Sequence, residues 1–186
     1  MRDEKDLWVF GYGSLMWRPG FEFEEQASAY VRGYHRSLCI FSHVHRGTPD
    51  KPGLVLGLDR GGACRGIAFR VAARRSEATL AYLREREQVT AVYLEAWLPM
   101  NLVDGRRVRC VAYVVDRSHP QYAGRPLPSD LLRLVAQGHG VSGANIDYVR
   151  ATHEHLIAAG ITDPTLSFVL QNVAPTEVRR FGDFSE

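Results

Sequence analysis

The sequence predicts an α+β fold, with strands in roughly the first two thirds of the chain and helices mainly in the last third. Short β-like runs alternate with turn signals up to residue 115, and helical periodicity dominates afterwards. No repeat, low-complexity segment or interdomain linker interrupts the chain. Its 186 residues, 45% of them hydrophobic, are enough to bury one core. We therefore expect one domain over residues 1–186, with its core at about 8–170.

The expected strands are short apolar or alternating runs bounded by glycine, proline or charged residues. In chain order they are residues 8–10, 29–34, 37–42, 54–58, 66–71, 93–99 and 108–115. Proline and glycine predict loops at 46–53, 60–62, 104–105 and 138–143. These breaks are short, so we interpret them as connections within one domain.

The expected helices show apolar residues at helical spacing. They cover residues 76–88, 129–137, 145–159 and, from a weaker pattern, 164–173. The polar, charged stretch after Ala174 predicts a partly disordered tail.

Composition argues against several classes of protein. The formal net charge of +2 comes from 23 basic and 21 acidic residues scattered along the chain, unlike the basic stripe of a nucleic-acid binder. No window approaches the roughly 18 apolar residues of a membrane span, and the N-terminus has no apolar signal-peptide region. The widely spaced cysteines Cys39, Cys64 and Cys110 form no disulfide framework or CxxC motif, which favours a reducing, cytoplasmic location.

A strand that runs into a glycine-bracketed turn is the first candidate site. Its residues are Val9, Phe10, Gly11, Tyr12, Gly13, Ser14 and Leu15. We expect the glycines to adopt backbone conformations closed to other residues and to let main-chain N–H groups approach a ligand. Met16 stands where a dinucleotide-binding fingerprint needs its third glycine, which excludes that motif. No GK[ST] follows any glycine, which excludes a phosphate-binding Walker loop. An ordinary strand-end turn remains the alternative.

Ser14 in this turn is interpreted as a binding residue. It lacks the GxSxG elbow that exposes a nucleophilic serine.

The helix over residues 76–88 carries the second candidate. Leu80, Leu83 and Glu87 are spaced i, i+3 and i+7, so a carboxylate ends an apolar stripe and should face inward. Burial and the negative end of the helix dipole both raise a carboxyl pKa, as a proton carrier requires. Glu85 lies about 200° round the helix and should be solvated. The spacing alone leaves open that Glu87 merely pairs with Arg84 or another arginine.

The remaining candidates are weaker. His43 and His45 are spaced i and i+2, which on a strand would point both the same way toward a metal, but no further ligands lie close in sequence. We favour a substrate-lining or structural loop and expect no metal. Tyr148 follows Asn145, a candidate helix cap, and is either a hydrogen-bond donor to substrate or part of the packing.

Several motifs in one order resemble a known family. They are the runs WVFGYGSLMW (8–17), VRGYHR (31–36) and HRGTPDKPGLVLGL (45–58), the pair Arg86-Glu87 with Tyr93 six residues after the glutamate, and the run NIDY (145–148). Together they are similar to the ChaC-like glutathione-specific γ-glutamylcyclotransferases over residues 8 to about 170.

The resemblance implies a compact, closed or partly closed β-sheet or barrel with helices packed around it. It implies that the YGSL loop (12–15) holds the γ-glutamyl group, with residues 9–11 leading into it, and that Glu87 is the catalytic acid/base. The arginine-glutamate element also fits Arg84-Glu85, so Glu85 stays an alternative. The step to Tyr93 and the inward helix face favour Glu87.

The activity that the resemblance implies is conversion of glutathione to 5-oxoproline and cysteinylglycine. Glutathione is then the small-molecule partner, and no metal or cofactor is expected. The alternatives are a cyclotransferase for another γ-glutamyl amine and a non-enzymatic regulator of cation transport, a label also given to the family.

Overall fold

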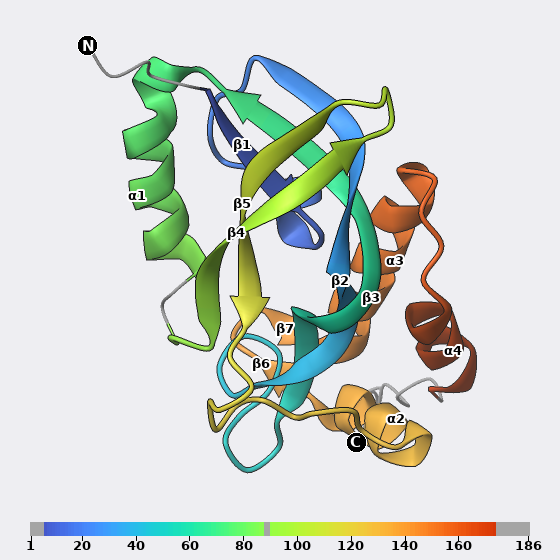
Figure 1. The fold of residues 1–186 in the computed structure, drawn as a ribbon. Coiled ribbons are helices and arrows are strands. Elements are labelled where there is room, and N and C mark those ends of the chain that lie inside the picture. Colours follow the sequence, from blue (N-terminus) through green and yellow to red (C-terminus); the bar gives the residue numbers. More distant parts are fainter. Residues whose placement is uncertain (1–5, 88–89, 174–186) are drawn as a thin grey trace, which may run out of the picture.

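The structure, a computed structural model, describes residues 6–87 and 90–173. Its centre is a closed barrel with the strand order β1-β3-β2-β4-β5 (Figure 1). The strands are β1 (Leu7–Gly11), β2 (Glu25–Ser42), β3 (Gly53–Val71), β4 (Tyr93–Leu102) and β5 (Arg107–Val115). Neighbouring strands are antiparallel except β1 and β5, which pair in parallel and close the barrel. The predicted α+β class is confirmed.

Long strands replace two pairs of short ones. The expected strands at 29–34 and 37–42 both lie in β2, and those at 54–58 and 66–71 both lie in β3. The loop predicted at 60–62 was wrong, because these residues lie inside β3. Gly61 and Gly62 have φ of 107° and 69° there. They lie opposite Gly33, whose φ is 84°, where the register of β2 and β3 shifts. Glycines at positive φ thus build a bulge that bends both strands without ending them.

The helices cover two sides of the barrel. Helix α1 (Ser76–Glu87) lies along one side, and α2 (Pro128–Gln137), α3 (Asn145–Ala158) and α4 (Pro164–Asn172) gather on the other (Figure 1). These bounds confirm the predicted helices to within about a residue at the ends that are described. Gln88, the expected end of the first helix, and the tail after Ala174 lie outside the described residues.

Short elements complete the fold. Turns η1 (Ser14–Met16) and η2 (Ala73–Arg75) are 3-10 helices. The expected loop at 138–143 contains a small hairpin of β6 (His139–Gly140) and β7 (Gly143–Ala144). Within the described part of the chain, no helix is both long and apolar enough to cross a membrane.

One apolar core joins the barrel to both sets of helices. Phe10, Phe69 and Tyr113 are almost fully buried in this core. Leu83 of α1 and Val149 of α3 belong to the same cluster with 0% exposure. The core therefore fixes where α1 ends and where α3 begins relative to the barrel.

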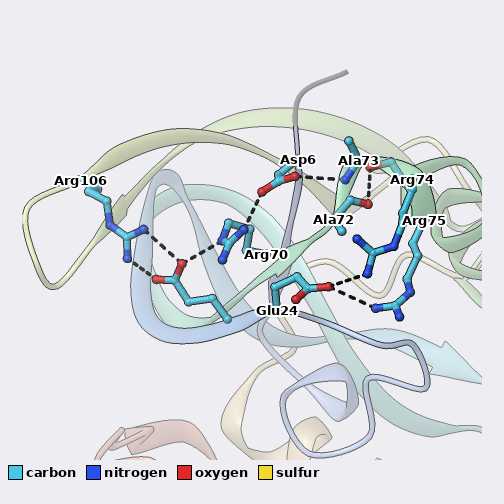
Figure 2. Close-up of polar contacts among 10 residues, drawn as sticks. Asp6, Glu24, Arg70, Ala72, Ala73, Arg74, Arg75 and Arg106 are labelled. Carbon is cyan, nitrogen blue, oxygen red and sulfur yellow. Dashed lines mark hydrogen bonds and ion pairs between the residues drawn. The ribbon is translucent and has the colours of Figure 1, made fainter. Parts of the chain in front are cut away.

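Ion pairs hold the end of the barrel where β1 begins (Figure 2). Arg70 at the end of β3 contacts Asp6 at 2.6 Å and Glu25 of β2 at 2.9 Å, and Arg106 of the β4–β5 turn also pairs with Glu25. Hydrogen bonds from these arginines lower the pKa of Asp6 and Glu25. Tyr12 follows the opposite end of β1, so this network lies away from the turn that the sequence singled out.

Candidate active site

The turn after β1 folds back onto the strand that carries it. β1 lies between β3 and β5 in the barrel wall. Val9 and Phe10 point to its opposite faces and both have 0% exposure, so the strand is covered on both faces. The turn closes when Met16 N–H donates to the Gly13 carbonyl at 2.9 Å. A Cβ on Gly11 would lie 3.2 Å from Leu15 Cβ and from Met16 N, so the missing side chain permits this close return.

The expectation of an unusual glycine backbone in this turn is met at Gly13 and not at Gly11. Gly11 ends β1 and has no positive φ, whereas Gly13 has φ of −133° and ψ of −132°, outside the extended and right-handed helical regions. A Cβ on Gly13 would meet Leu56 Cδ1 at an ordinary 3.8 Å. The turn therefore depends on the close approach at Gly11 and on the backbone conformation of Gly13.

A cavity opens beside this turn, and we call it the Glu87 cavity. Its lining residues are Tyr12, Gly13, Ser14, Leu15, Leu56, Glu87, Tyr93, Tyr113 and Tyr148. The structure thus brings together the loop 12–15, Glu87 and Tyr148, which the sequence singled out separately. Val9, Phe10 and Gly11 do not line the cavity but carry the loop that does. Their part in substrate binding stays a prediction.

Three lining residues were missed by sequence reasoning. Leu56, Tyr93 and Tyr113 come from β3, β4 and β5, so they meet only because the barrel closes. The sequence could have indicated Tyr93, because this tyrosine follows Glu87 by six residues in the motif that resembles the family. Leu56 and Tyr113 lie in ordinary apolar strand patterns, which do not mark them as site residues.

Glu87 is the last residue of α1 and faces inward. Its side chain is 17% exposed, Leu83 one turn earlier is 0% exposed, and Glu85 is exposed. The orientation predicted from helical spacing is therefore confirmed. Burial raises the pKa of the Glu87 carboxyl, and the nearby Arg86 guanidinium only partly opposes this effect. A carboxyl with a raised pKa exchanges protons near neutral pH more readily than an ordinary one.

Arg86 ties the catalytic candidate to the turn. Its Nε lies 3.2 Å from Glu87 Oε1, its Nη2 donates to Ser14 Oγ at 3.0 Å, and its Nη1 donates to the Arg18 carbonyl at 2.6 Å. Arg84 pairs instead with Glu95 at 2.7 Å. The ion pair expected from the alternative interpretation of Glu87 thus exists, but with Arg86, and it leaves the carboxyl pKa raised.

The tyrosines of the cavity are neutral hydrogen-bonding groups. Burial, with a smaller effect of the negative charge of Glu87, raises the pKa of Tyr12 and Tyr93 well above the ordinary value and that of Tyr148 to about 12. Tyr93 Oη donates to the Leu56 carbonyl at 2.7 Å, while Tyr148 Oη accepts from Leu56 N–H at 3.1 Å. The Tyr148 hydroxyl therefore keeps its proton to offer to a ligand.

Asn145 positions Tyr148 without capping the helix, so the cap prediction was wrong. Asn145 is the first residue of α3 and has 0% exposure. Its amide accepts from Leu54 N–H at 2.7 Å and donates to the Leu54 carbonyl at 2.8 Å, as a strand neighbour would. This pairing anchors α3 to β3. The Arg46 guanidinium lies over the Tyr148 ring, 5.6 Å from its centre.

The histidine pair lies beyond the end of β2, so the expected strand geometry does not apply. His45 Nδ1 lies 3.0 Å from Ser142 Oγ, and the His43 ring stacks on Phe41 with centres 6.2 Å apart. Over residues 6–87 and 90–173, no group of three or more histidine, cysteine, aspartate or glutamate side chains is arranged to hold a metal.

The profile of the ChaC-like protein family matches residues 7–176. A glutathione-specific γ-glutamylcyclotransferase of Escherichia coli K12 is 35% identical over 97% of this chain and 78% of its own length. The glutathione-specific γ-glutamylcyclotransferase 1 of Homo sapiens is 33% identical, with coverage of 94% and 85%.

Solved structures share the fold. A yeast γ-glutamyl cyclotransferase specific to glutathione superposes with a TM-score of 0.80 at 21% identity, over 91% of this chain and 96% of that one. A second structure, named γ-glutamyl cyclotransferase, gives a TM-score of 0.56 at 14% identity, over 98% and 95%. The family match over nearly the whole sequence, the barrel that these structures share and the identities to the relatives lead to one conclusion: the chain belongs to the ChaC-like protein family.

Proposed function

We propose that the protein is a glutathione-specific γ-glutamylcyclotransferase with Glu87 as its general acid/base. The observation that carries the proposal is a buried carboxyl of raised pKa that faces the 12–15 loop among neutral tyrosines. The names of the relatives at 30–35% identity support glutathione as the substrate. The products are 5-oxoproline and cysteinylglycine.

The reaction begins with the substrate's own amine. An α-amino group has a pKa of about 8 and is mostly protonated at neutral pH, so a base must take a proton before attack. Glu87 is that base. The freed nitrogen attacks the γ-carbonyl carbon and forms the five-membered ring, and holding the γ-glutamyl chain folded removes most of the entropic cost.

The second step breaks the bond to cysteine. Protonated Glu87 gives its proton to the leaving cysteinyl nitrogen as the carbon–nitrogen bond breaks, so one carboxyl serves both transfers. No electron transfer or added water is needed. Gly13, Ser14 and Leu15 line the cavity, and their main-chain N–H groups are the proposed oxyanion donors, each typically worth about 3–4 kcal/mol in such a role. Tyr148 offers a further proton to the bound γ-glutamyl group.

Ser14 has a supporting part in this proposal. Its hydroxyl accepts from Arg86, which suits a residue that fixes the loop and not one that attacks the substrate. We further propose that the chain acts as one domain in the cytoplasm.

Incubation of the purified protein with reduced glutathione tests the proposal. We expect stoichiometric 5-oxoproline and cysteinylglycine by chromatography, at a rate unchanged after dialysis against a chelator. Faster turnover of γ-glutamylalanine than of glutathione would shift the assignment to another γ-glutamyl amine. Absence of turnover on either substrate would favour a non-enzymatic regulator.

A further inference from the structure

We propose that a second cavity next to Glu87 binds the cysteinylglycine half of glutathione and recognises its terminal carboxylate through His43 and His45. The inference deepens the proposed function and rests on it. The cavity, here the His43 cavity, is lined by residues of the end of β2, the loop that follows it and the start of β4. Glu87 and Tyr93 line both cavities.

The shared residues set the direction of the substrate. Glu87 must reach both the attacking amine and the leaving nitrogen, so the scissile bond lies beside its carboxyl. The γ-glutamyl group occupies the Glu87 cavity on the loop side. The leaving half must then extend away from that loop. The His43 cavity shares Glu87 and Tyr93 with the Glu87 cavity but is lined by none of the loop residues 12–15, so we assign the leaving half to it.

The lining of the His43 cavity suits a small thiol-bearing dipeptide. Ile40 and Val92 are 2% and 1% exposed and, with Val55, give an apolar wall for the cysteinyl side chain. Gln121 Nε2 donates to the Phe41 carbonyl at 3.0 Å, which leaves the amide oxygen as an acceptor for the N–H of the glycine. The wall and the amide together fit a peptide unit better than a free amine.

The polar lining of the cavity suits a carboxylate held by the two histidines. Among the described residues that line it, Glu87 is the acidic one. Arg86 is already paired with Glu87 and Ser14, which leaves His43 and His45 as the basic donors. His45 Nδ1 is held by Ser142 Oγ, so the Nε2 edge is left for a ligand. The His43 ring lies nearly parallel to the Phe41 ring, with the ring centres 6.2 Å apart. Two fixed imidazole edges are suitable donors to a carboxylate.

This assignment gives the histidine pair a role that needs no metal. It also accounts for discrimination between glutathione and shorter γ-glutamyl compounds. A γ-glutamyl amine without the glycine carboxylate leaves the histidine edges unpaired and binds more weakly.

The test compares glutathione with its C-terminal amide, which differs only in that carboxylate. For the wild type we expect a higher kcat/KM on glutathione. The double variant His43→Ala/His45→Ala should lose about ten- to a hundredfold on glutathione, mainly through KM, and little on the amide, so the preference disappears. His45→Gln keeps an N–H donor, so this variant should keep part of the preference for glutathione over its amide. His139→Ala, which alters an exposed histidine outside both cavities, is the matched control.

Two results would overturn the inference. If the wild type turns over glutathione but the double variant keeps its preference, or loses both substrates equally with an unchanged thermal midpoint, the His43 cavity does not bind the carboxylate. A wild type inactive on every γ-glutamyl substrate would overturn the proposed function, and this inference with it.

Discussion

At the scale of single residues, Glu87 combines features that a structural ion pair would not need. It ends an apolar helix stripe, it is mostly buried, and its pKa is raised although Arg86 lies 3.2 Å away. An ion pair formed for stability would normally lower a carboxyl pKa. The raised value therefore favours a group kept ready to accept and return a proton.

Replacement of Glu87 by glutamine separates catalysis from stability. Glutamine keeps the size but accepts no proton, so Glu87→Gln should lose about 10⁴-fold or more in turnover, the upper end for acid/base groups, because one carboxyl serves twice. Stability should not fall. A group whose pKa is raised by folding stabilises the fold below its unfolded pKa and loses this contribution as pH rises through the folded pKa. At neutral pH the uncharged variant should thus have an equal or higher thermal midpoint.

Glu85→Gln is the matched control, since Glu85 is exposed on the same helix. It should keep normal turnover and stability. An active Glu87→Gln protein, or an inactive Glu85→Gln beside it, would place the base elsewhere, and a much less stable Glu87→Gln would support the purely structural ion pair.

At the scale of elements, the end of α1 and the turn after β1 work as one unit because Arg86 bridges them. The guanidinium contacts Ser14 and the Arg18 carbonyl on the turn and Glu87 on the helix. Displacement of either element by an ångström would separate the proposed base from the proposed oxyanion donors. Such displacements cost enzymes up to about 10²-fold.

Arg86→Met should affect both the position of the loop and the pKa of Glu87. We expect kcat to fall by at least about tenfold, because the loop loses its link to the helix. The acid limb of the pH–rate profile should move to higher pH, because removal of a cation that lowers the Glu87 pKa lets that pKa rise further. Arg84→Met, which breaks the pair with Glu95, should leave the limb in place. An unmoved limb in Arg86→Met would contradict the electrostatic part of this account.

At the scale of the whole molecule, Asp59 connects the barrel to the segment that leads into the helices α2 to α4. Its side chain, 8% exposed on β3, accepts from Arg117 Nε at 2.7 Å and from the Tyr122 hydroxyl at 2.9 Å. Burial alone would raise the Asp59 pKa, but these bonds and one from the Arg60 amide lower it. The neighbouring Ala123 N–H donates to the Cys39 carbonyl of β2 at 2.7 Å.

Asp59→Asn should destabilise the whole molecule in a pH-dependent way. At neutral pH we expect a loss of about 1–3 kcal/mol in the free energy of unfolding, from the weakened bonds to buried or half-buried donors. A lowered pKa contributes stability above the unfolded value and loses it as pH falls through the folded value. The variant and the wild type should therefore converge in acid. Urea unfolding across pH checks this, with exposed Asp147→Asn as control; a pH-independent difference would contradict it.

The sequence by itself determined the parts that depend on local pattern. Helical spacing placed Glu87 inward and Glu85 outward, strand patterns located the barrel strands, and motifs in one order indicated the family. These features depend on residues a few positions apart, whose side chains meet whatever the rest of the chain does.

Only the tertiary structure decided how distant segments meet. A pair of glycines is equally compatible with a loop and with a bulge. The pairing of β2 with β3 around Gly33 made residues 60–62 a bulge. Asn145 became a strand partner of Leu54 instead of a cap, since α3 packs where β3 begins. Closure of the barrel through β1 and β5 brought the tyrosines around Glu87. Such contacts depend on the packing of elements far apart in sequence, which no local pattern records.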